Sequence, residues 1–424
     1  MTNLGAASPV TPLGVTGRIN WRGLALTAGI AAIVLAAFAN SVSVTGAIVT
    51  DDSDWAPKLY HPALMLAGAA VALRGRMVRP RVELLVYFAV TITATLLAYT
   101  VFEPRLAGVR LLVPLGVALI GTQLGRVSDA RTVLRGCRIA SVVFLIIVTV
   151  KNVQHVPAFV AYLANPLGHP DVPTLSNGGV NIEATWLALS STFLIGTALF
   201  IPFAMAAAAT SALYASRVGI VLVALAGCAA VAHAWGQWHA TRVARVEPAV
   251  SAPSQRGRKR ATTLIVTAAA AYAFGAAMVT VRQLGDPAYV AQRFATIGEE
   301  PGSMGRLTLW RGGLRVFAEY PLGVGVGNAM PMFRRVIGVD VPEGNLHNIY
   351  LQHAVETGLP GLLALLVFAA MVGRRLLASR FRDPLLIFVG GYFVAGVIQF
   401  TGVDAIVWLI YGLQWGMTRG GAGA

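Results

Sequence analysis

The sequence predicts an all-α polytopic membrane protein with about twelve transmembrane helices and one large loop outside the membrane. Its 424 residues are 56% hydrophobic and only 12% charged, whereas soluble domains carry about 25% charged residues. The mean hydropathy is +0.68. Apolar segments of roughly 15–20 residues recur along the chain, the length at which an α-helix crosses about 30 Å of hydrocarbon. These observations exclude a soluble globular protein.

Each apolar segment is a predicted span. In chain order the spans cover residues 23–42, 60–73, 83–101, 108–124, 138–151, 182–198, 200–215, 218–238, 262–281, 358–373, 384–402 and 404–418. The segment 182–215 could form one long helix or two short helices that meet near Pro202. Two helices are favoured, because a single helix would place the arginine clusters of the chain on opposite faces of the membrane.

Arginine clusters set the predicted orientation. Lys and Arg outnumber Asp and Glu by 33 to 18, and the clusters follow the second, fourth and tenth spans and precede the ninth. All of them then fall on the cytoplasmic side, as do both termini. The positive charge therefore indicates orientation and contact with anionic membrane lipids rather than nucleic-acid binding. The clusters are Arg74, Arg76, Arg79 and Arg81; Arg126, Arg131, Arg135 and Arg138; Arg256, Arg258, Lys259 and Arg260; and Arg374, Arg375, Arg380 and Arg382.

The N-terminus and the cysteines add little chemistry. The first apolar run contains Ala37-Phe38-Ala39, which resembles a signal-peptidase site, but the run continues to Val49. We therefore expect an uncleaved first helix. Cys137 and Cys228 imply no disulfide framework, and no Cys/His pattern has zinc spacing.

The predicted organisation has three regions. Residues 1–281 form a membrane domain of nine spans, residues 282–357 a large loop on the outer face of the membrane that contains helices, and residues 358–424 a membrane domain of three spans. The loop is rich in arginine although the orientation rule disfavours positive charge on that face. We therefore expect these arginines to bind something. They are Arg282, Arg293, Arg306, Arg311, Arg315, Arg334 and Arg335.

The end of this loop, GNLHNIYLQHAVETGLPGL at residues 344–362, concentrates polar side chains before an apolar run. On a helix from about Asn345, His347 would share a face with Tyr350, while Gln352 and Glu356 would share another. A histidine at a membrane surface is suited to act as a general base toward a sugar hydroxyl. The alternative is an interfacial histidine that caps a helix. Glu356 lies about half a turn around the axis, so it is a poor candidate for orienting the imidazole directly.

A second polar stretch is GRLTLWRGGLRVFAEYPLGVGVGN at residues 305–328. On a helix, Arg306 and Trp310 share one face, and Arg311 and Arg315 form another stripe. The planar guanidinium group matches phosphate oxygens, so this stretch could bind a lipid diphosphate; the alternative is a surface helix on phospholipid. The glycines that follow lack the spacing and the preceding strand of a dinucleotide-binding loop.

Two shorter motifs lie between spans. In YASRVG, residues 214–219, Arg217 is close to hydrocarbon and would either face a polar cavity or snorkel to the interface. In DDSD, residues 51–54, Asp52 and Asp54 could hold a divalent metal. A solvated loop is favoured there because no third ligand is apparent, so we predict no metal and no cofactor.

Three of these motifs together resemble the O-antigen ligases and related polymerases. HNIYLQHAVETGLPG resembles their H-x-x-x-L-x-x-x-x-E-x-G-x-x-G signature, and RLTLWRGGLRVFAEYPLGVGVGN resembles their R-x-x-x-W stretch followed by P-L-x-G-x-G. ASRVG resembles their S-R-G turn between spans, with Val218 in place of the glycine. The resemblance is close over about residues 181–362 and elsewhere extends only to the pattern of spans.

The resemblance implies transfer of a polysaccharide from undecaprenyl diphosphate to an acceptor at the periplasmic face of the bacterial inner membrane. His347 would then deprotonate the acceptor hydroxyl, and Arg217 and Arg306 would bind the diphosphate and stabilise it as a leaving group. The reading from the residues agrees, since cationic donors belong where negative charge develops. Further candidates for substrate binding are Arg311, Arg315, Trp310, Gln352 and Tyr350.

The predicted function is that of the ligase that joins O-antigen to lipid A–core oligosaccharide. One dominant loop and a short C-terminal tail favour a ligase over an O-antigen polymerase or a protein O-oligosaccharyltransferase of the same superfamily. A flippase for lipid-linked glycans should carry polar residues at mid-depth along several spans, whereas here they gather at one surface. A lipid-binding scaffold would keep its function without His347.

Overall fold

The protein is described by a computed structural model that covers residues 21–43, 45, 58–72, 80–103, 107–164, 170–243, 301–341, 343–399, 402 and 404–420. These residues are arranged as helices and connecting turns, with one isolated β-bridge between Ser43 and Lys58. The described part of the chain contains no β-strand. The predicted all-α fold is confirmed for this part.

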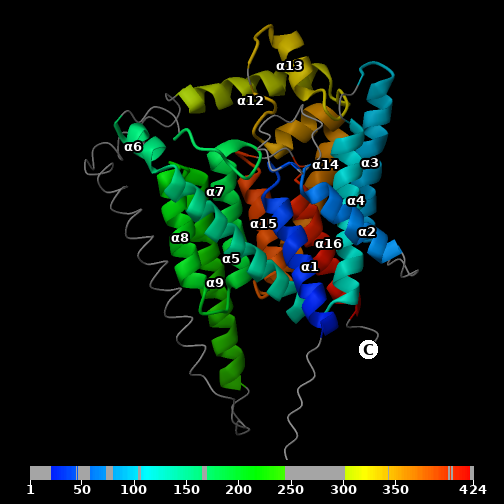
Figure 1. Cartoon of the computed structure of the whole chain (residues 1–424). Coiled ribbons are helices and arrows are strands. Elements are labelled where there is room, and N and C mark those ends of the chain that lie inside the picture. The colour runs from blue at the N-terminus through cyan, green and yellow to red at the C-terminus, as the bar shows by residue number, and fades with distance from the viewer. Residues whose placement is uncertain are drawn as a thin grey trace, which may run out of the picture.

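Long helices run side by side as a bundle, and two helices lie across one end of it (Figure 1). The first half of the chain contributes α1 (Trp21–Phe38), α2 (Tyr60–Ala72), α3 (Val82–Tyr99), α4 (Ala107–Val127), α5 (Ala130–Gln154), α6 (Val156–Ala164), α7 (Gly179–Ser190), the 3₁₀ helix η1 (Ser191–Leu194), α8 (Phe200–Leu213) and α9 (Arg217–Val243). The second half contributes α12 (Pro301–Glu319), α13 (Ala329–Ile337), α14 (Ile349–Ala378), α15 (Pro384–Ala395) and α16 (Ala405–Gly420).

The chain is a multi-pass membrane protein. Among the described residues, 6 helices are long and apolar enough to cross a membrane, namely α1, α3, α4, α5, α9 and α14, and α8 and α15 are shorter apolar helices. The helices at five other predicted spans are shorter than 18 residues: α2, α7, α8, α15 and α16. The predicted span 262–281 lies outside the described residues. The count of about twelve spans therefore stays a prediction.

The chain reverses direction within 182–215. The helical segment that ends at Leu194 is followed by Gly196, whose φ of +77° breaks the helix, and α8 begins at Phe200. The hydroxyl of Tyr214, just after α8, lies 2.5 Å from the carboxylate of Glu183 near the start of α7. The end of α8 is thus beside the beginning of α7, and the two helices are antiparallel. The prediction of two helices here agrees with the structure.

Helices α4 and α16 pack backbone against backbone. A Cβ atom on Gly121 would lie 2.6 Å from the carbonyl oxygen of Leu409, and one on Gly416 would lie 2.0 Å from that of Thr122. Gly121 and Gly125, like Gly412 and Gly416, are four residues apart and so share a helix face. Small residues at this spacing allow helices to approach closely in a membrane. This packing places α16 inside the bundle.

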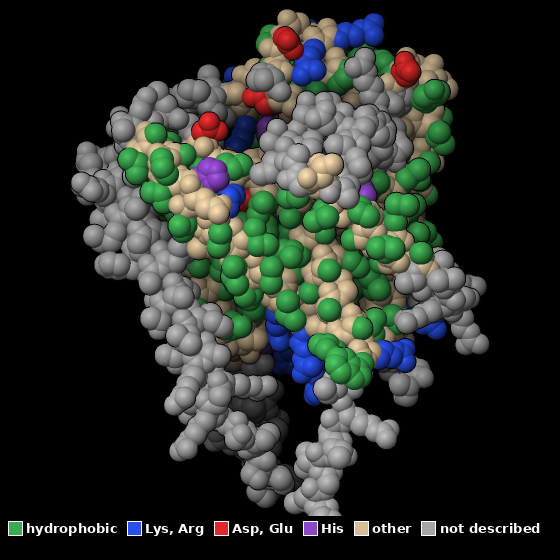
Figure 2. All heavy atoms as spheres, viewed as in Figure 1, with side chains coloured by type: hydrophobic (Ala, Val, Ile, Leu, Met, Phe, Trp, Pro, Cys, Tyr) green, Lys and Arg blue, Asp and Glu red, His purple; other side chains and the backbone are tan. Residues whose placement is uncertain are grey.

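The arginine clusters of the described part lie at one end of the bundle, around the end of α16. Arg81 stacks over the ring of Trp415 at 3.6 Å, and Arg375 donates to the hydroxyl of Tyr411 at 3.0 Å. The backbone of Arg126 approaches Gly416. Figure 2 shows Lys and Arg side chains gathered below a broad apolar belt, at the end opposite α12 and α13. Arg81, Arg126 and Arg375, one from each described cluster, therefore share one side, as predicted, whereas Arg74, Arg76, Arg79 and the cluster at 256–260 lie outside the described residues.

The two helices across the other end have a core of their own. Leu309 and Val316 of α12 and Phe333 of α13 are buried against Leu346 and Val355, which belong to the turn before α14 and to α14 itself. This apolar contact holds α12 and α13 on the bundle end. We call the two helices the cap.

Candidate active site

His347 lies in the turn that precedes α14, beneath the cap. The helix begins at Ile349, because the side chain of Asn348 caps it by accepting from the N–H groups of Tyr350 and Leu351, each at 3.0 Å. An N-cap residue has extended backbone, which excludes a helix through it. The prediction that His347 and Tyr350 share a face of one helix is therefore wrong. His347 instead has a left-handed φ of +51°.

Arg306 lies near His347, and Arg217 lies near Arg306, and the three side chains come from three different elements. Arg306 projects from α12 and Arg217 is the first residue of α9. Burial lowers the pKa of the His347 imidazole, the nearby Arg306 cation lowers it further, and Glu343 opposes this effect. Burial also lowers the pKa of Arg306, and the Arg217 cation adds to it. The structure thus brings together the predicted histidine and both predicted arginines.

This group lies at the cap end of the bundle. Figure 2 shows basic and histidine side chains inside a hollow between the cap and the tops of neighbouring helices. Arg217 and Arg306 are two cations near each other, and such a pair makes a site in which an anion would be stabilised.

Three predicted substrate-binding side chains have hydrogen-bond partners within the protein. The indole N–H of Trp310 donates to the carbonyl oxygen of Leu346 at 3.0 Å. The amide oxygen of Gln352 accepts from the N–H of Leu346 at 3.0 Å. The hydroxyl of Tyr350 donates to the carbonyl oxygen of Phe393 at 2.8 Å. All three surround the site, and their contact with substrate stays a prediction.

Arg311 and Arg315 lie on the exposed side of α12, away from the buried side that carries Leu309 and Val316. Arg315 is 66% exposed and forms an ion pair with Glu319, one turn further along, at 3.4 Å. Such exposed pairs contribute little to stability. The structure therefore separates these two arginines from Arg306, and their substrate binding also stays a prediction.

The glycine-rich segment 321–328 supplies hydrogen-bond donors to the carbonyl groups that the kink of α14 leaves without a partner. Pro360 has no N–H to donate to the carbonyl oxygen of Glu356, and this oxygen accepts from Gly325 at 2.8 Å instead. Val324 donates to the carbonyl oxygen of Val355 at 3.0 Å. Hydrogen bonds from the segment thus replace those that the kinked helix cannot make, as membrane helices require.

Glycine is needed on both sides of this contact. Gly358 has φ +66° and ψ −167° within α14, and a Cβ there would lie 2.3 Å from the carbonyl carbon of Leu322. A Cβ on Gly323, whose φ is +90°, would lie 2.6 Å from the carbonyl oxygen of Glu356. These glycines therefore permit close backbone contact, which agrees with the exclusion of a dinucleotide-binding loop. The predicted span 358–373 becomes the second part of a longer, kinked helix.

Arg110 is a residue of this region that sequence reasoning missed. Its guanidinium lies 3.4 Å from the carboxylate of Glu356, and both side chains are largely buried. The same carboxylate accepts from the N–H of Gly327 at 3.0 Å and from the side chain of Gln352 at 2.7 Å. The sequence did carry a signal for Arg110. It lies inside a predicted apolar span, and a charged residue there usually faces a partner within the protein.

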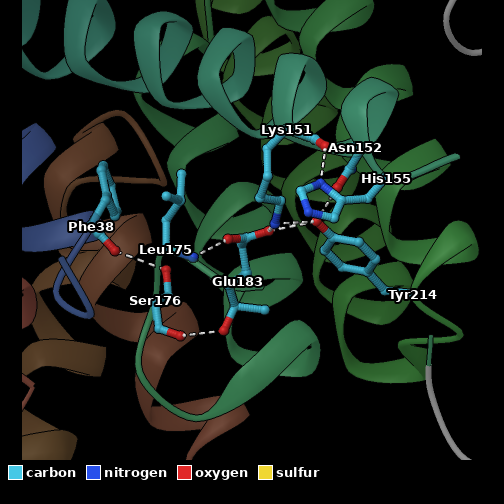
Figure 3. A network of polar contacts seen from close by, with 9 residues as sticks. Phe38, Lys151, Asn152, His155, Leu175, Ser176, Glu183 and Tyr214 are labelled. Atoms are coloured by element: carbon cyan, nitrogen blue, oxygen red, sulfur yellow. Dashed lines mark hydrogen bonds and ion pairs between the residues drawn. The ribbon is translucent and has the colours of Figure 1, made fainter. Parts of the chain in front are cut away.

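A second buried network, also missed, supports the turn that carries Arg217 (Figure 3). Lys151 of α5 forms an ion pair with Glu183 of α7 and donates to the hydroxyl of Tyr214 at 2.9 Å. That hydroxyl lies 2.7 Å from the amide oxygen of Asn152. Tyr214 precedes Arg217 by three residues, so these contacts fix the turn between α8 and α9 to the bundle.

The described residues contain no group of three or more His, Cys, Asp and Glu that could hold a metal ion. Asp52 and Asp54 lie outside the described residues. The expectation that no metal is needed therefore stays a prediction.

A multi-pass helical bundle with a histidine and two converging arginines under a helical cap defines a membrane protein with a polar site at one membrane surface. Residues 202–366 match a family model described as O-antigen ligase. This match, over less than half of the chain, confirms the resemblance found in the sequence and supports a membrane glycosyltransferase of the O-antigen ligase and polymerase type. The matched region includes Arg217, Arg306 and His347. No curated protein matches the chain.

Proposed function

We propose that the protein transfers O-antigen polysaccharide from undecaprenyl diphosphate to lipid A–core oligosaccharide. The reaction would take place at the periplasmic face of the bacterial inner membrane, and both termini would be cytoplasmic. The observation that carries this proposal is that Arg306, from the cap, lies near both His347 and Arg217 at the cap end of the bundle. The position of the basic clusters at the opposite end of the bundle supports the orientation.

The two arginines are suited to the diphosphate. Arg217 and Arg306 repel each other, and a diphosphate between them would remove that repulsion. As the glycosidic bond to the donor breaks, negative charge builds on the departing diphosphate oxygen, and preorganised cations stabilise it. Guanidinium groups contact phosphate oxygens through two parallel hydrogen bonds.

His347 is suited to the acceptor. Burial and Arg306 both favour the neutral imidazole, which is the form that accepts a proton. The acceptor hydroxyl oxygen attacks the anomeric carbon of the donor while its proton passes to His347. The new glycosidic bond forms as the bond to the diphosphate breaks, and undecaprenyl diphosphate leaves.

Reconstitution tests the proposal. Purified protein in lipid vesicles is supplied with undecaprenyl-diphosphate glycan and, separately, with lipid A–core, a second lipid-linked glycan or a pilin-like protein. We expect a covalent product with lipid A–core. A product with the second glycan instead would identify a polymerase, and one with the protein acceptor an O-oligosaccharyltransferase. Movement of the donor across the bilayer without a product would identify a flippase.

The pH dependence of transfer should report the environment of His347. Because its pKa is lowered, the imidazole of the free enzyme stays neutral to a lower pH than an exposed histidine, and kcat/KM should fall only below about 6.5. Glu343→Gln removes the group that raises this pKa, so the pH below which kcat/KM falls should be lower still. The measurement is kcat/KM for the donor from pH 5 to 8, because this ratio reports the groups of the free enzyme. An acid limb above 6.5 in the wild type would contradict the assignment.

Metal removal should leave transfer unchanged. A bound cation and an arginine pair serve the same purpose, which is to neutralise charge on the leaving diphosphate. We therefore expect full activity in EDTA and tolerance of the double replacement Asp52→Ala with Asp54→Ala. Activity that is lost in EDTA and returns with magnesium or manganese would instead place DDSD in the active site.

A further inference from the structure

The peptide groups on both sides of Leu346 are held by side chains from two helices. The N–H of Leu346 donates to the amide oxygen of Gln352 in α14 at 3.0 Å, and its carbonyl oxygen accepts from the indole N–H of Trp310 in α12 at 3.0 Å. Leu346 is fully buried. Its carbonyl belongs to the peptide bond that leads into His347. The backbone immediately before the histidine is therefore fixed from above by the cap and from below by α14.

His347 needs such support because of its conformation. Its φ of +51° lies in the left-handed region, which residues with a Cβ rarely adopt. The N–H of His347 donates to the side chain of Asn345 at 2.8 Å, and Asn348 immediately begins the helix. This short turn closes around His347, and contacts from outside the turn must supply the remaining restraint.

We infer that Trp310 and Gln352, anchored by Glu356, form a clamp that positions the His347 imidazole against Arg306. They are positioning residues, and neither needs to touch substrate. The catalytic consequence rests on the proposed function, whereas the geometry of the clamp does not.

The hydrogen bond from Gln352 to Glu356 explains why a glutamine is suited to position 352. The amide nitrogen of Gln352 donates to the carboxylate of Glu356 at 2.7 Å, which directs its oxygen toward the N–H of Leu346. An amide side chain can donate at one atom and accept at another, whereas an ionised carboxylate can only accept. Glu356 is itself held by Arg110 and by the N–H of Gly327. Glu356 therefore acts on His347 through Gln352, although the two residues are nine positions apart in the motif.

The clamp also connects the two halves of the site. Trp310 is one helical turn from Arg306 on α12. The hydrogen bond from Trp310 to Leu346 thus ties the helix that carries the arginine to the turn that carries the histidine. Loss of the clamp should disturb the distance between base and arginine without removing either group.

Two clamp variants and one matched control test this inference. Gln352→Leu removes both hydrogen bonds of the glutamine, and Trp310→Phe removes only the indole donor while keeping an aromatic ring in the cap. The control is Gln414→Leu. Gln414 is also buried and also donates to a carboxylate, that of Asp383 at 3.0 Å, but it lies in α16 at the opposite end of the bundle.

The first readout does not depend on activity. Intact protein in vesicles is treated with diethyl pyrocarbonate, and the modification rate of His347 is followed by mass spectrometry. We expect faster modification of His347 in both clamp variants and an unchanged rate in Gln414→Leu. Equal rates in all proteins would overturn the clamp, even if the proposed reaction were correct.

The second readout separates positioning from donor binding. A misplacement of about 1 Å can reduce a rate by about a hundredfold, so we expect kcat to fall by about 10–100-fold in both clamp variants, with the donor KM nearly unchanged. If KM for the donor rises while kcat is kept, Gln352 belongs to the donor site and the inference is wrong. If the wild type transfers no glycan, the proposed function fails while the labelling result still decides the clamp. If Gln352→Leu does not fold, Trp310→Phe decides both readouts.

Discussion

His347→Ala should abolish glycan transfer, with kcat lowered by about 10²–10⁴-fold, while the protein still inserts and binds donor. The large effect is expected because the variant removes the group that accepts the proton of the acceptor hydroxyl. Donor binding depends on Arg217 and Arg306, which remain. Transfer to lipid A–core in vesicles and binding of undecaprenyl-diphosphate glycan are the two measurements.

The control for this variant is His61→Ala. His61 is also a half-buried histidine near a helix start, where its ring accepts from the N–H of Lys58 at 3.0 Å. Its loss should leave kcat close to that of the wild type. Near-normal transfer by a folded His347→Ala protein would remove the histidine from the mechanism.

Arg306→Lys and Arg217→Lys should each impair transfer severely although the charge is kept. A lysine supplies a point charge and cannot reproduce the two parallel hydrogen bonds of a guanidinium group. Hydrogen bonds to charged groups contribute about 1.5–3 kcal/mol, which corresponds to about 10–150-fold in rate if one is lost in the transition state. We expect the larger loss at Arg306. Its surroundings match the R-x-x-x-W motif of the family, whereas the S-R-G motif at Arg217 has Val218 in place of the glycine, and Arg306 acts directly on His347.

Steady-state kinetics with lipid-linked donor measure this effect, and Arg131→Lys is the control. Arg131 is an exposed arginine near the start of α5, at the end of the bundle opposite the cap, and its replacement should be neutral. Recovery of most activity by lysine at Arg306 or Arg217 would show that this residue supplies only general electrostatic attraction.

From the sequence, the candidate site residues could be selected, whereas their surroundings could not be predicted. His347, Arg306 and Arg217 could be selected because arginines and a histidine next to hydrocarbon need a polar partner or a function. Their convergence from three separate elements could not be derived from helical periodicity. The start of α14 was misplaced because Asn345 and Asn348 can both cap a helix, and only the hydrogen bonds of Asn348 decide between them.

The contacts that organise the site are long-range, and single-sequence patterns carry no signal for them. Arg110 and Glu356 are separated by 246 positions, and Lys151 and Glu183 by 32. A charged residue inside an apolar span indicates that it has a partner, but the sequence does not say which residue that partner is. Apolar periodicity, in contrast, depends only on local spacing. It predicted the bundle helices of the described part to within about five residues, apart from the extensions of α5 and α14 and the earlier ends of α7 and α15.

The contact between segment 321–328 and the kink of α14 also has a consequence for biogenesis. The ribosome completes this segment before α14, and on the proposed topology it must be translocated first. Without it, the carbonyl oxygens of Val355 and Glu356 would enter the bilayer without donors, at a cost of several kcal/mol each. On that topology, we expect α14 to reach its final depth only after the preceding segment has been translocated. The order in which the two elements are synthesised thus sets the order in which they assemble. Segment 321–328 is in place first, and α14 then packs against it.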